Sequence, residues 1–189
     1  MKKKSVIILV AILAVVVILV GSLISTYNGL NSLRSDVEEA QAQISTQLQR
    51  RSDLIPNLVS TVKGYAEHEK EVFTAIADAR SKLSGANTIT EQAAANDELS
   101  SAISRLLVVV EQYPTLKADT NFIALQDQLE GTENRIATAR NDYNENVKEF
   151  NKKIRSFPTN IIAGMFGFSE YSYFEADASA NQVPNVSFE

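Results

Sequence analysis

Residues 6–24 read VIILVAILAVVVILVGSLI, an apolar run of 19 residues that contains no charged side chain. The run follows the basic cluster Lys2-Lys3-Lys4, with only Ser5 between them. As an α-helix it would extend roughly 28 Å, which is close to the thickness of the hydrocarbon core of a bilayer. The sequence therefore predicts that residues 1–25 form a basic start and a transmembrane anchor, with the lipid bilayer as the partner of residues 6–24.

A cleaved secretory signal is the alternative for the same residues. It would share the basic start, but its apolar core would be roughly 7–15 residues long and an A-x-A-like cleavage site would follow. Orientation follows from the basic residues at the two ends of the run. Three lysines precede it, whereas Arg34 is the only basic residue within about 15 positions after it. We therefore expect a single-pass membrane protein with a cytoplasmic N-terminus and an exported domain.

The composition limits what that domain can do. Without residues 1–25, the chain keeps 15 basic and 23 acidic residues. So acidic a domain repels nucleic acid, which excludes nucleic acid as a partner. The absence of cysteine excludes disulfides, thiol catalysis and zinc-thiolate sites. Seven glycines and four prolines in 189 residues indicate a helical protein.

Apolar residues recur every three or four positions from Tyr27 onward, which is the spacing of one helix face. Three series predict helical segments at residues 26–83, 89–113 and 119–156. Because short joints fold consecutive helices back on one another, we expect an all-α fold. It would consist of the N-terminal transmembrane helix followed by an antiparallel long-helix bundle of three to four helices over residues 26–157.

The joints carry the residues that end and begin helices. The loop 84–87 contains Gly85, and Thr88-x-x-Glu91 is a capping box that would start the second helix. Pro114 would end that helix, and Asp119 or Thr120 would cap the next one.

Pro56 lies inside the first long series and allows two interpretations. It either kinks one continuous helix, or it occupies the first turn of a new helix capped by Ser52 or Asp53. The apolar series keeps its phase across Pro56, which favours the kink.

Two positions on the apolar faces carry charge. Arg51 lies between Leu48 and Ile55, and Glu69 occupies an equivalent place further along. In one interpretation both side chains reach solvent at the edge of the interface between helices. In the other they form ion pairs with the last long helix, where Glu133 and Arg140 flank the apolar series, and these pairs set the register of the helices.

After the apolar run the chain contains the following motifs in this order: Tyr27-Asn28, residues 49–59 (QRRSDLIPNLV), Val62-Lys63-Gly64-Tyr65, His68-Glu69, Ala79-Arg80, Tyr113-Pro114, residues 129–136 (LEGTENRI), Ala139-Arg140, Phe157-Pro158, Phe166-Gly167-Phe168 and Tyr173-Phe174-Glu175-Ala176. With these motifs the chain resembles the LemA family over nearly its whole length after the anchor. The resemblance implies a single-pass protein of the bacterial cell membrane with a bundle of long helices. It implies no catalytic residues.

The residues themselves also argue against an enzyme. His68 is the only histidine, and the string that it begins has valine at position 72 where a zinc-protease HExxH helix has its second histidine. No Gly-x-Ser-x-Gly elbow, phosphate loop or dinucleotide fingerprint is present. We expect no catalytic residue, no metal and no cofactor.

The C-terminal segment, residues 158–189, breaks the helical pattern and is rich in aromatic residues up to Phe174. In one interpretation these residues fold back on the end of the bundle. In the other they form an interaction patch for a partner or a membrane interface, made of Phe166, Phe168, Tyr171, Tyr173 and Phe174. Residues 177–189 are small and polar and are predicted to form a loose tail.

Taken together, these features predict a membrane-anchored helical scaffold that engages other proteins of the bacterial cell envelope. Self-association is left open. The alternative is an accessory component of a membrane complex, with a role in ligand binding or in a stress response.

Overall fold

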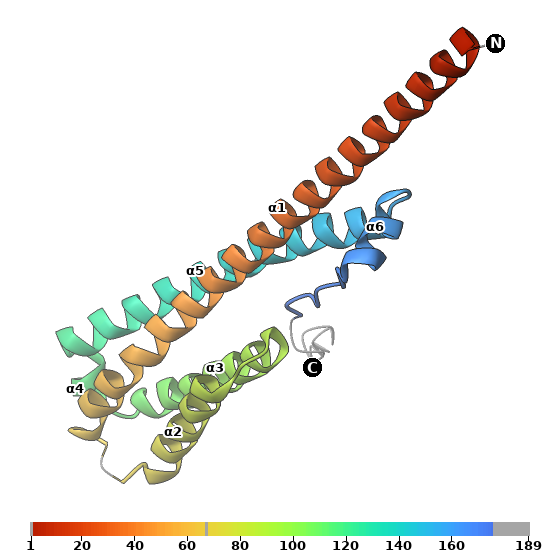
Figure 1. Ribbon diagram of the computed structural model, residues 1–189. Coiled ribbons are helices and arrows are strands. Elements are labelled where there is room, and N and C mark those ends of the chain that lie inside the picture. Colours follow the sequence, from red (N-terminus) through yellow and green to blue (C-terminus); the bar gives the residue numbers. More distant parts are fainter. Residues whose placement is uncertain (1, 67, 176–189) are drawn as a thin grey trace, which may run out of the picture. The chain divides into compact units, whose positions relative to one another are not determined.

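The computed structural model describes residues 2–66 and 68–175, and in these residues the fold is helical with no β-strand. The all-α prediction is therefore confirmed, whereas the predicted loose tail, residues 177–189, lies outside the described part. The helices, in chain order, are α1 (Lys2–Lys63), α2 (Lys70–Gly85), α3 (Ile89–Val110), α4 (Pro114–Lys117), α5 (Thr120–Arg155) and α6 (Thr159–Phe166) (Figure 1).

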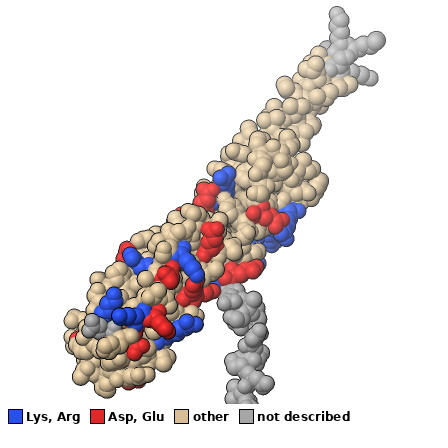
Figure 2. Space-filling view, turned by 90° about the horizontal axis from the view of Figure 1, so that it is seen from below, with Lys and Arg blue, Asp and Glu red and all other residues tan. Residues whose placement is uncertain are grey.

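The chain divides into two compact units. Unit 1 comprises Met1–Glu39 and Glu145–Tyr171, and unit 2 comprises Ala40–Asn144 and Ser172–Glu189. Charged side chains of both signs are interspersed on the surface that Figure 2 shows, and neither sign forms a continuous field there.

In unit 1, the described side chains of α1 are exposed throughout residues 6–24, and Leu30 is the first that is fully buried. Among the described residues, α1 is the one helix that is long and apolar enough to cross a membrane. Beyond this stretch the helix contributes Leu30 and Val37 to a core that also contains Val147, Phe150 and Ile154 of α5. The apolar run is therefore continuous with a packed helix.

The predicted helix over residues 26–83 is wrong in its second part, because α1 ends at Lys63 and α2 begins at Lys70. Gly64 follows directly, and glycine has the weakest helix propensity after proline. The change of direction also shifts the apolar pattern by one residue. Tyr65 continues the three-and-four spacing of the first apolar series, and that spacing predicts a buried side chain. Tyr65 is 43% exposed, and Ala66 is buried instead.

The helix α1 continues through Pro56 without a break. A proline in a helix interior has no N–H to donate to the carbonyl four residues earlier, which here belongs to Ser52. Arg80 of α2 supplies the missing donor, because its Nε lies 3.1 Å from the Ser52 carbonyl oxygen. The contact between α2 and α1 thus satisfies the carbonyl that Pro56 leaves without its helical partner.

The predicted caps of α3 and α5 are confirmed. The Thr88 side chain accepts a hydrogen bond from the Glu91 amide, and the Glu91 carboxylate accepts one from the Thr88 amide. The Asp119 carboxylate accepts hydrogen bonds from the amides of Asn121 and Phe122 at the start of α5. One expectation fails at the C-terminus, since residues 159–166 form the helix α6 instead of an irregular segment.

We expect Arg80→Met to lower the free energy of unfolding by about 1 kcal/mol, because it leaves the Ser52 carbonyl without a donor. In a Pro56→Ala background the same change should cost much less, since the amide of residue 56 then donates to that carbonyl. Chemical unfolding in mild detergent, followed by circular dichroism, measures both costs. Lys82→Met on the same helix is the matched control, and equal costs of Arg80→Met in the two backgrounds would refute the explanation.

The amides of Asn87 and Thr88 hold the pKa of the Glu91 carboxyl below its ordinary value of 4.5. A carboxyl whose pKa is lower in the folded state stabilises the fold above its unfolded pKa, and this stabilisation is lost as pH falls through the folded pKa. Glu91→Gln should therefore be less stable than the original chain near pH 7, and the difference should shrink below about pH 4.5. Unfolding curves at several pH values test this, and a pH-independent difference would contradict it.

Candidate functional site

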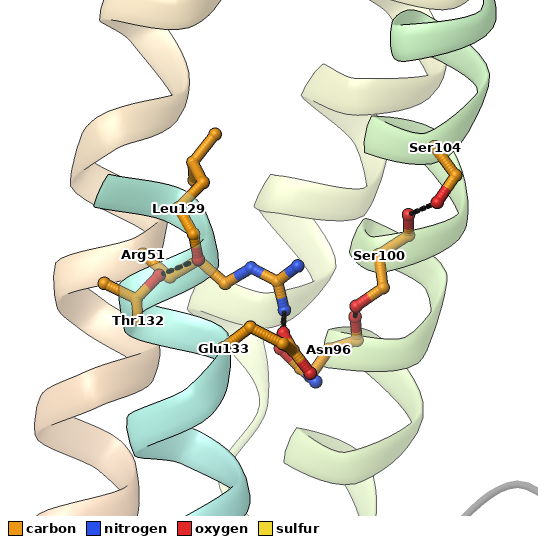
Figure 3. Close-up of polar contacts among 7 residues, drawn as sticks. All are labelled: Arg51, Asn96, Ser100, Ser104, Leu129, Thr132 and Glu133. Carbon is orange, nitrogen blue, oxygen red and sulfur yellow. Dashed lines mark hydrogen bonds and ion pairs between the residues drawn. The ribbon is translucent and has the colours of Figure 1, made fainter. Parts of the chain in front are cut away.

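A buried polar cluster lies in unit 2, where Arg51 of α1 meets α3 and α5. The Arg51 guanidinium is almost fully buried, donates a hydrogen bond of 2.7 Å to the Asn96 side-chain oxygen, and forms an ion pair with Glu133 (Figure 3). Asn96 is itself fully buried, whereas the Glu133 side chain is 43% exposed. We call Arg51, Asn96 and Glu133 the Arg51 cluster. It joins three helices through one side chain.

Burial lowers the pKa of Arg51, whereas the negative charges of Glu133 and Asp97 raise it again. An arginine stays protonated in proteins even so, which means that the core of unit 2 contains a positive charge. Taking such a charge out of water costs several kcal/mol unless partners compensate it. The carboxylate of Glu133 and the amide oxygen of Asn96 are those partners.

The neighbouring hydroxyl groups bond within their own helices. Thr132 donates to the Leu129 carbonyl, and Ser100 donates to the carbonyl of Asn96 (Figure 3). Within the described residues, Arg51 Nε and Asn96 Nδ2 have no hydrogen-bond partner. Because the guanidinium is enclosed by three helices, we expect the cluster to fix the register of those helices.

Of the four charged residues that the sequence singled out, the structure brings two together. Arg51 and Glu133 form the ion pair. Glu69 is the residue that precedes α2, and its side chain makes no capping hydrogen bond there. Arg140 lies over the ring of Phe174, with its guanidinium carbon 4.3 Å from the ring centroid, which is a cation–π contact.

A second candidate site is an aromatic cluster in unit 1, which consists of Tyr27, Phe150, Phe166, Phe168 and Tyr171. Tyr27 of α1 contacts Phe166 and Phe168, with ring centroids 4.9 and 5.8 Å apart. Phe150 of α5 contacts Phe168 and Tyr171, with centroids 6.3 and 5.3 Å apart. The cluster therefore holds the segment around α6 against both long helices of this unit.

Asparagine side chains of α5 hold the chain after α6. In unit 1, Asn151 donates to the Tyr171 carbonyl and accepts from the Tyr171 amide. In unit 2, Asn144 does the same with Phe174. Each side-chain amide thus makes the two backbone hydrogen bonds that a neighbouring strand would make with an extended segment in a sheet.

The predicted interaction patch is consequently not a single exposed surface. Phe174 is only 2% exposed and belongs to the core of unit 2, and Phe168 and Tyr171 are half-buried. Phe166 and Tyr173 remain exposed. The fold-back interpretation accounts for Phe174, Phe168 and Tyr171, so a partner could reach the other two.

The described residues do not gather possible metal ligands in one place. In the part of the chain that the structure describes, no three His, Asp or Glu side chains are placed to hold a metal ion. His68 is exposed in the connection between α1 and α2. Its neighbour Glu69 precedes α2, so the two residues do not lie on one helix face.

The sequence analysis missed the contacts that three residues make in the folded chain, namely Asn96, Arg80 and Tyr27. Asn96 occupies a core position of α3, whose buried residues step by three and four through the following positions: Ile89, Ala93, Asn96, Leu99, Ile103, Leu106 and Val110. A polar residue inside that series could have been noticed. Tyr27 begins the apolar series and Arg80 belongs to a family motif, but no pattern identified their partners, which lie far away in sequence.

Known proteins resemble this chain over most of its length. A model of the LemA family matches residues 40–188. Magnetosome protein MamQ 2 of Paramagnetospirillum magneticum is 26% identical over 90% of this chain and 72% of its own length. Magnetosome protein MamQ of Magnetospirillum gryphiswaldense is 24% identical over 88% and 71%, and Protein LemA of Metamycoplasma hominis is 27% identical over 79% and 68%. None of these names denotes an enzyme.

The geometry of the Arg51 cluster predicts that replacing Glu133 and replacing Arg51 cost different amounts of free energy of unfolding. Glu133→Gln should lower the free energy of unfolding by about 1–3 kcal/mol, because the buried guanidinium loses its counter-charge. Arg51→Met, which keeps much of the side-chain volume and removes the buried charge, should cost less than Glu133→Gln. Chemical unfolding in mild detergent measures both.

The matched control is Glu98→Gln, which removes the carboxylate of an exposed ion pair with Lys82. It should change the free energy of unfolding by less than about 0.5 kcal/mol. A cost of Glu133→Gln as small as that of the control would show that the pair contributes nothing to the fold.

Proposed function

The chain belongs to the LemA family, and we propose on this premise that it is a membrane-anchored helical scaffold without catalytic activity, which holds other proteins at the bacterial cell membrane. The observation that carries the proposal is the exposed apolar stretch at residues 6–24, which continues as the same helix into the core at Leu30. Lipid would cover the exposed side chains of this stretch, and each buried CH₂ group would contribute about 0.8 kcal/mol.

The remaining helices fit a scaffold of the antiparallel bundle type. In unit 2, hydrogen bonds and ion pairs from Arg51 and Arg80 connect α1 to α2, α3 and α5. The connections between consecutive helices are short, and α2 and α3 are joined by three residues. Such a bundle offers long exposed helix faces, on which a partner helix can pack.

The direction of insertion follows from the basic residues before the apolar run. With three lysines on one side and Arg34 alone near the other, we propose that the N-terminus is cytoplasmic and that the helices after residue 25 are exported. The partners are then other proteins of the cell envelope. The relatives that are named magnetosome proteins support a role at a membrane.

A reporter enzyme that is active only outside the cytoplasm, fused after Glu189, should be active in cells. The physical reason is that lysines before the apolar run resist transfer across the membrane. Replacement of Lys2, Lys3 and Lys4 by glutamate should lower this activity, whereas replacement of the three by arginine should leave it unchanged. An inactive fusion on the original chain, with a cytoplasmic reporter active at the same position, would reverse the proposed orientation.

Purification in mild detergent after cross-linking in cells should recover the full chain with protein partners in fixed ratio. A chain cut after Glu39, which keeps the anchor and loses unit 2 together with the second segment of unit 1, should lose those partners. If the full chain is recovered alone, the scaffold proposal fails and a ligand-binding accessory role replaces it.

A further inference from the structure

The helix α6 has apolar side chains on two sides. Ile162 and Ala163 are buried in unit 1. Ile161 and Met165, one turn apart, are 55% and 70% exposed, and Phe166 beside them is 55% exposed. Phe157, shortly before the helix, is also largely exposed. Packing in the core of unit 1 explains the apolar residues of the buried side only. The exposed side of α6 calls for a different apolar environment.

The position of this exposed side is defined by Tyr27. The ring of Tyr27 lies 4.9 Å from that of Phe166. Tyr27 follows the last residue of the apolar run, Ile24, by three residues, which is about 4.5 Å along the helix. The polar layer of a bilayer extends about 5–7 Å beyond each side of the hydrocarbon core. With residues 6–24 in the hydrocarbon, Tyr27 and Phe166 both fall in this layer, where tyrosine is enriched.

The charged residues near the exposed side of α6 also fit a place in the polar layer of a bilayer. Residues 156–169 contain no charged side chain, and the lysines that precede them, Lys152 and Lys153, are exposed in the last turn of α5. Glu170, the first acidic residue after them, is paired with Arg155. Lysines that precede an apolar segment in sequence can meet lipid phosphates with their cations when the segment lies in the plane of a membrane.

We propose that the exposed face of α6, made of Phe157, Ile161, Met165 and Phe166, lies in the interfacial layer of the bilayer as a second membrane contact beside the anchor. Its occupant is lipid, because the face continues the exposed apolar surface of α1 through the contact between Tyr27 and Phe166. The inference rests on the proposed membrane anchor. Its consequence is that unit 1 contacts the membrane at two places, which limits its rotation about the anchor axis.

The test uses the absence of tryptophan from the chain, so that one introduced tryptophan reports alone. Three full-length variants, Met165→Trp, Val15→Trp and Ser35→Trp, are reconstituted in vesicles of phosphatidylcholine and phosphatidylglycerol. All three positions are exposed, so the substitutions disturb little packing. Ser35 lies on the same helix as the anchor, about 16 Å beyond Ile24, and serves as the aqueous reference. The lipids carry bromine either near the headgroup or deep in the acyl chains, and bromine quenches tryptophan emission on contact.

We expect Met165→Trp to emit at shorter wavelength than Ser35→Trp and to lose most emission to the shallow bromines. Val15→Trp should lose most to the deep bromines. If Val15→Trp is quenched and Met165→Trp behaves as Ser35→Trp does, the second contact is refuted while the anchor stands. If Val15→Trp escapes quenching, the anchor itself fails. A Met165→Trp emission that is shifted to shorter wavelength yet unquenched would mean that protein, such as a second copy of the chain, covers α6, and would overturn the assignment to lipid.

Discussion

The buried charge of Arg51 is the constraint on which unit 2 depends. A guanidinium that is removed from water must find a carboxylate and hydrogen-bond acceptors, and here they come from α3 and α5. The next residue, Ser52, has a carbonyl that Pro56 leaves without its helical donor, and α2 provides that donor through Arg80. Two adjacent residues of α1 therefore need all three other long helices. A slip of any helix by one turn, about 5.4 Å, would leave at least one of these groups unpaired. Apolar side chains alone would tolerate such a slip far better, because their contacts are not directional.

Unit 1 is organised differently, around apolar and aromatic contacts near the end of the predicted span. Tyr27 is the first aromatic residue after the run, and its ring packs against Phe166 and Phe168. Phe168 in turn contacts Phe150 of α5. Asn151 then holds the backbone at Tyr171 by two hydrogen bonds. The segment after α5 is thus tied to the helix that contains the proposed anchor. For an anchored protein this matters, because the orientation of the attached part relative to the bilayer is set by the residues that surround the end of the span.

Several features of the sequence predicted their structures well because they depend on neighbours along the chain. The capping box at Thr88 and the cap at Asp119 involve residues within three positions of each other, so their spacing alone identifies them. The position of Arg51 on the apolar face of its helix followed from the apolar residues that precede and follow it in sequence. The end of α1 at Lys63 was missed, because the one-residue shift from Tyr65 to Ala66 leaves a series of threes and fours nearly unchanged. The helix α6 was missed as well, since eight residues are too short for a periodic pattern to stand out from a generally apolar segment.

By itself, the sequence determined the apolar run, the helical class, the helix caps and the membership of the LemA family, because each of these is written in local composition, spacing or an ordered set of motifs. Tertiary structure alone decided which partner each special residue has. Asn96 for Arg51, Arg80 for the Ser52 carbonyl, and Phe166 for Tyr27 are separated by 45, 28 and 139 positions along the chain. No periodic pattern reaches across such distances. These pairs form only when the folded helices bring together groups whose burial would otherwise cost free energy.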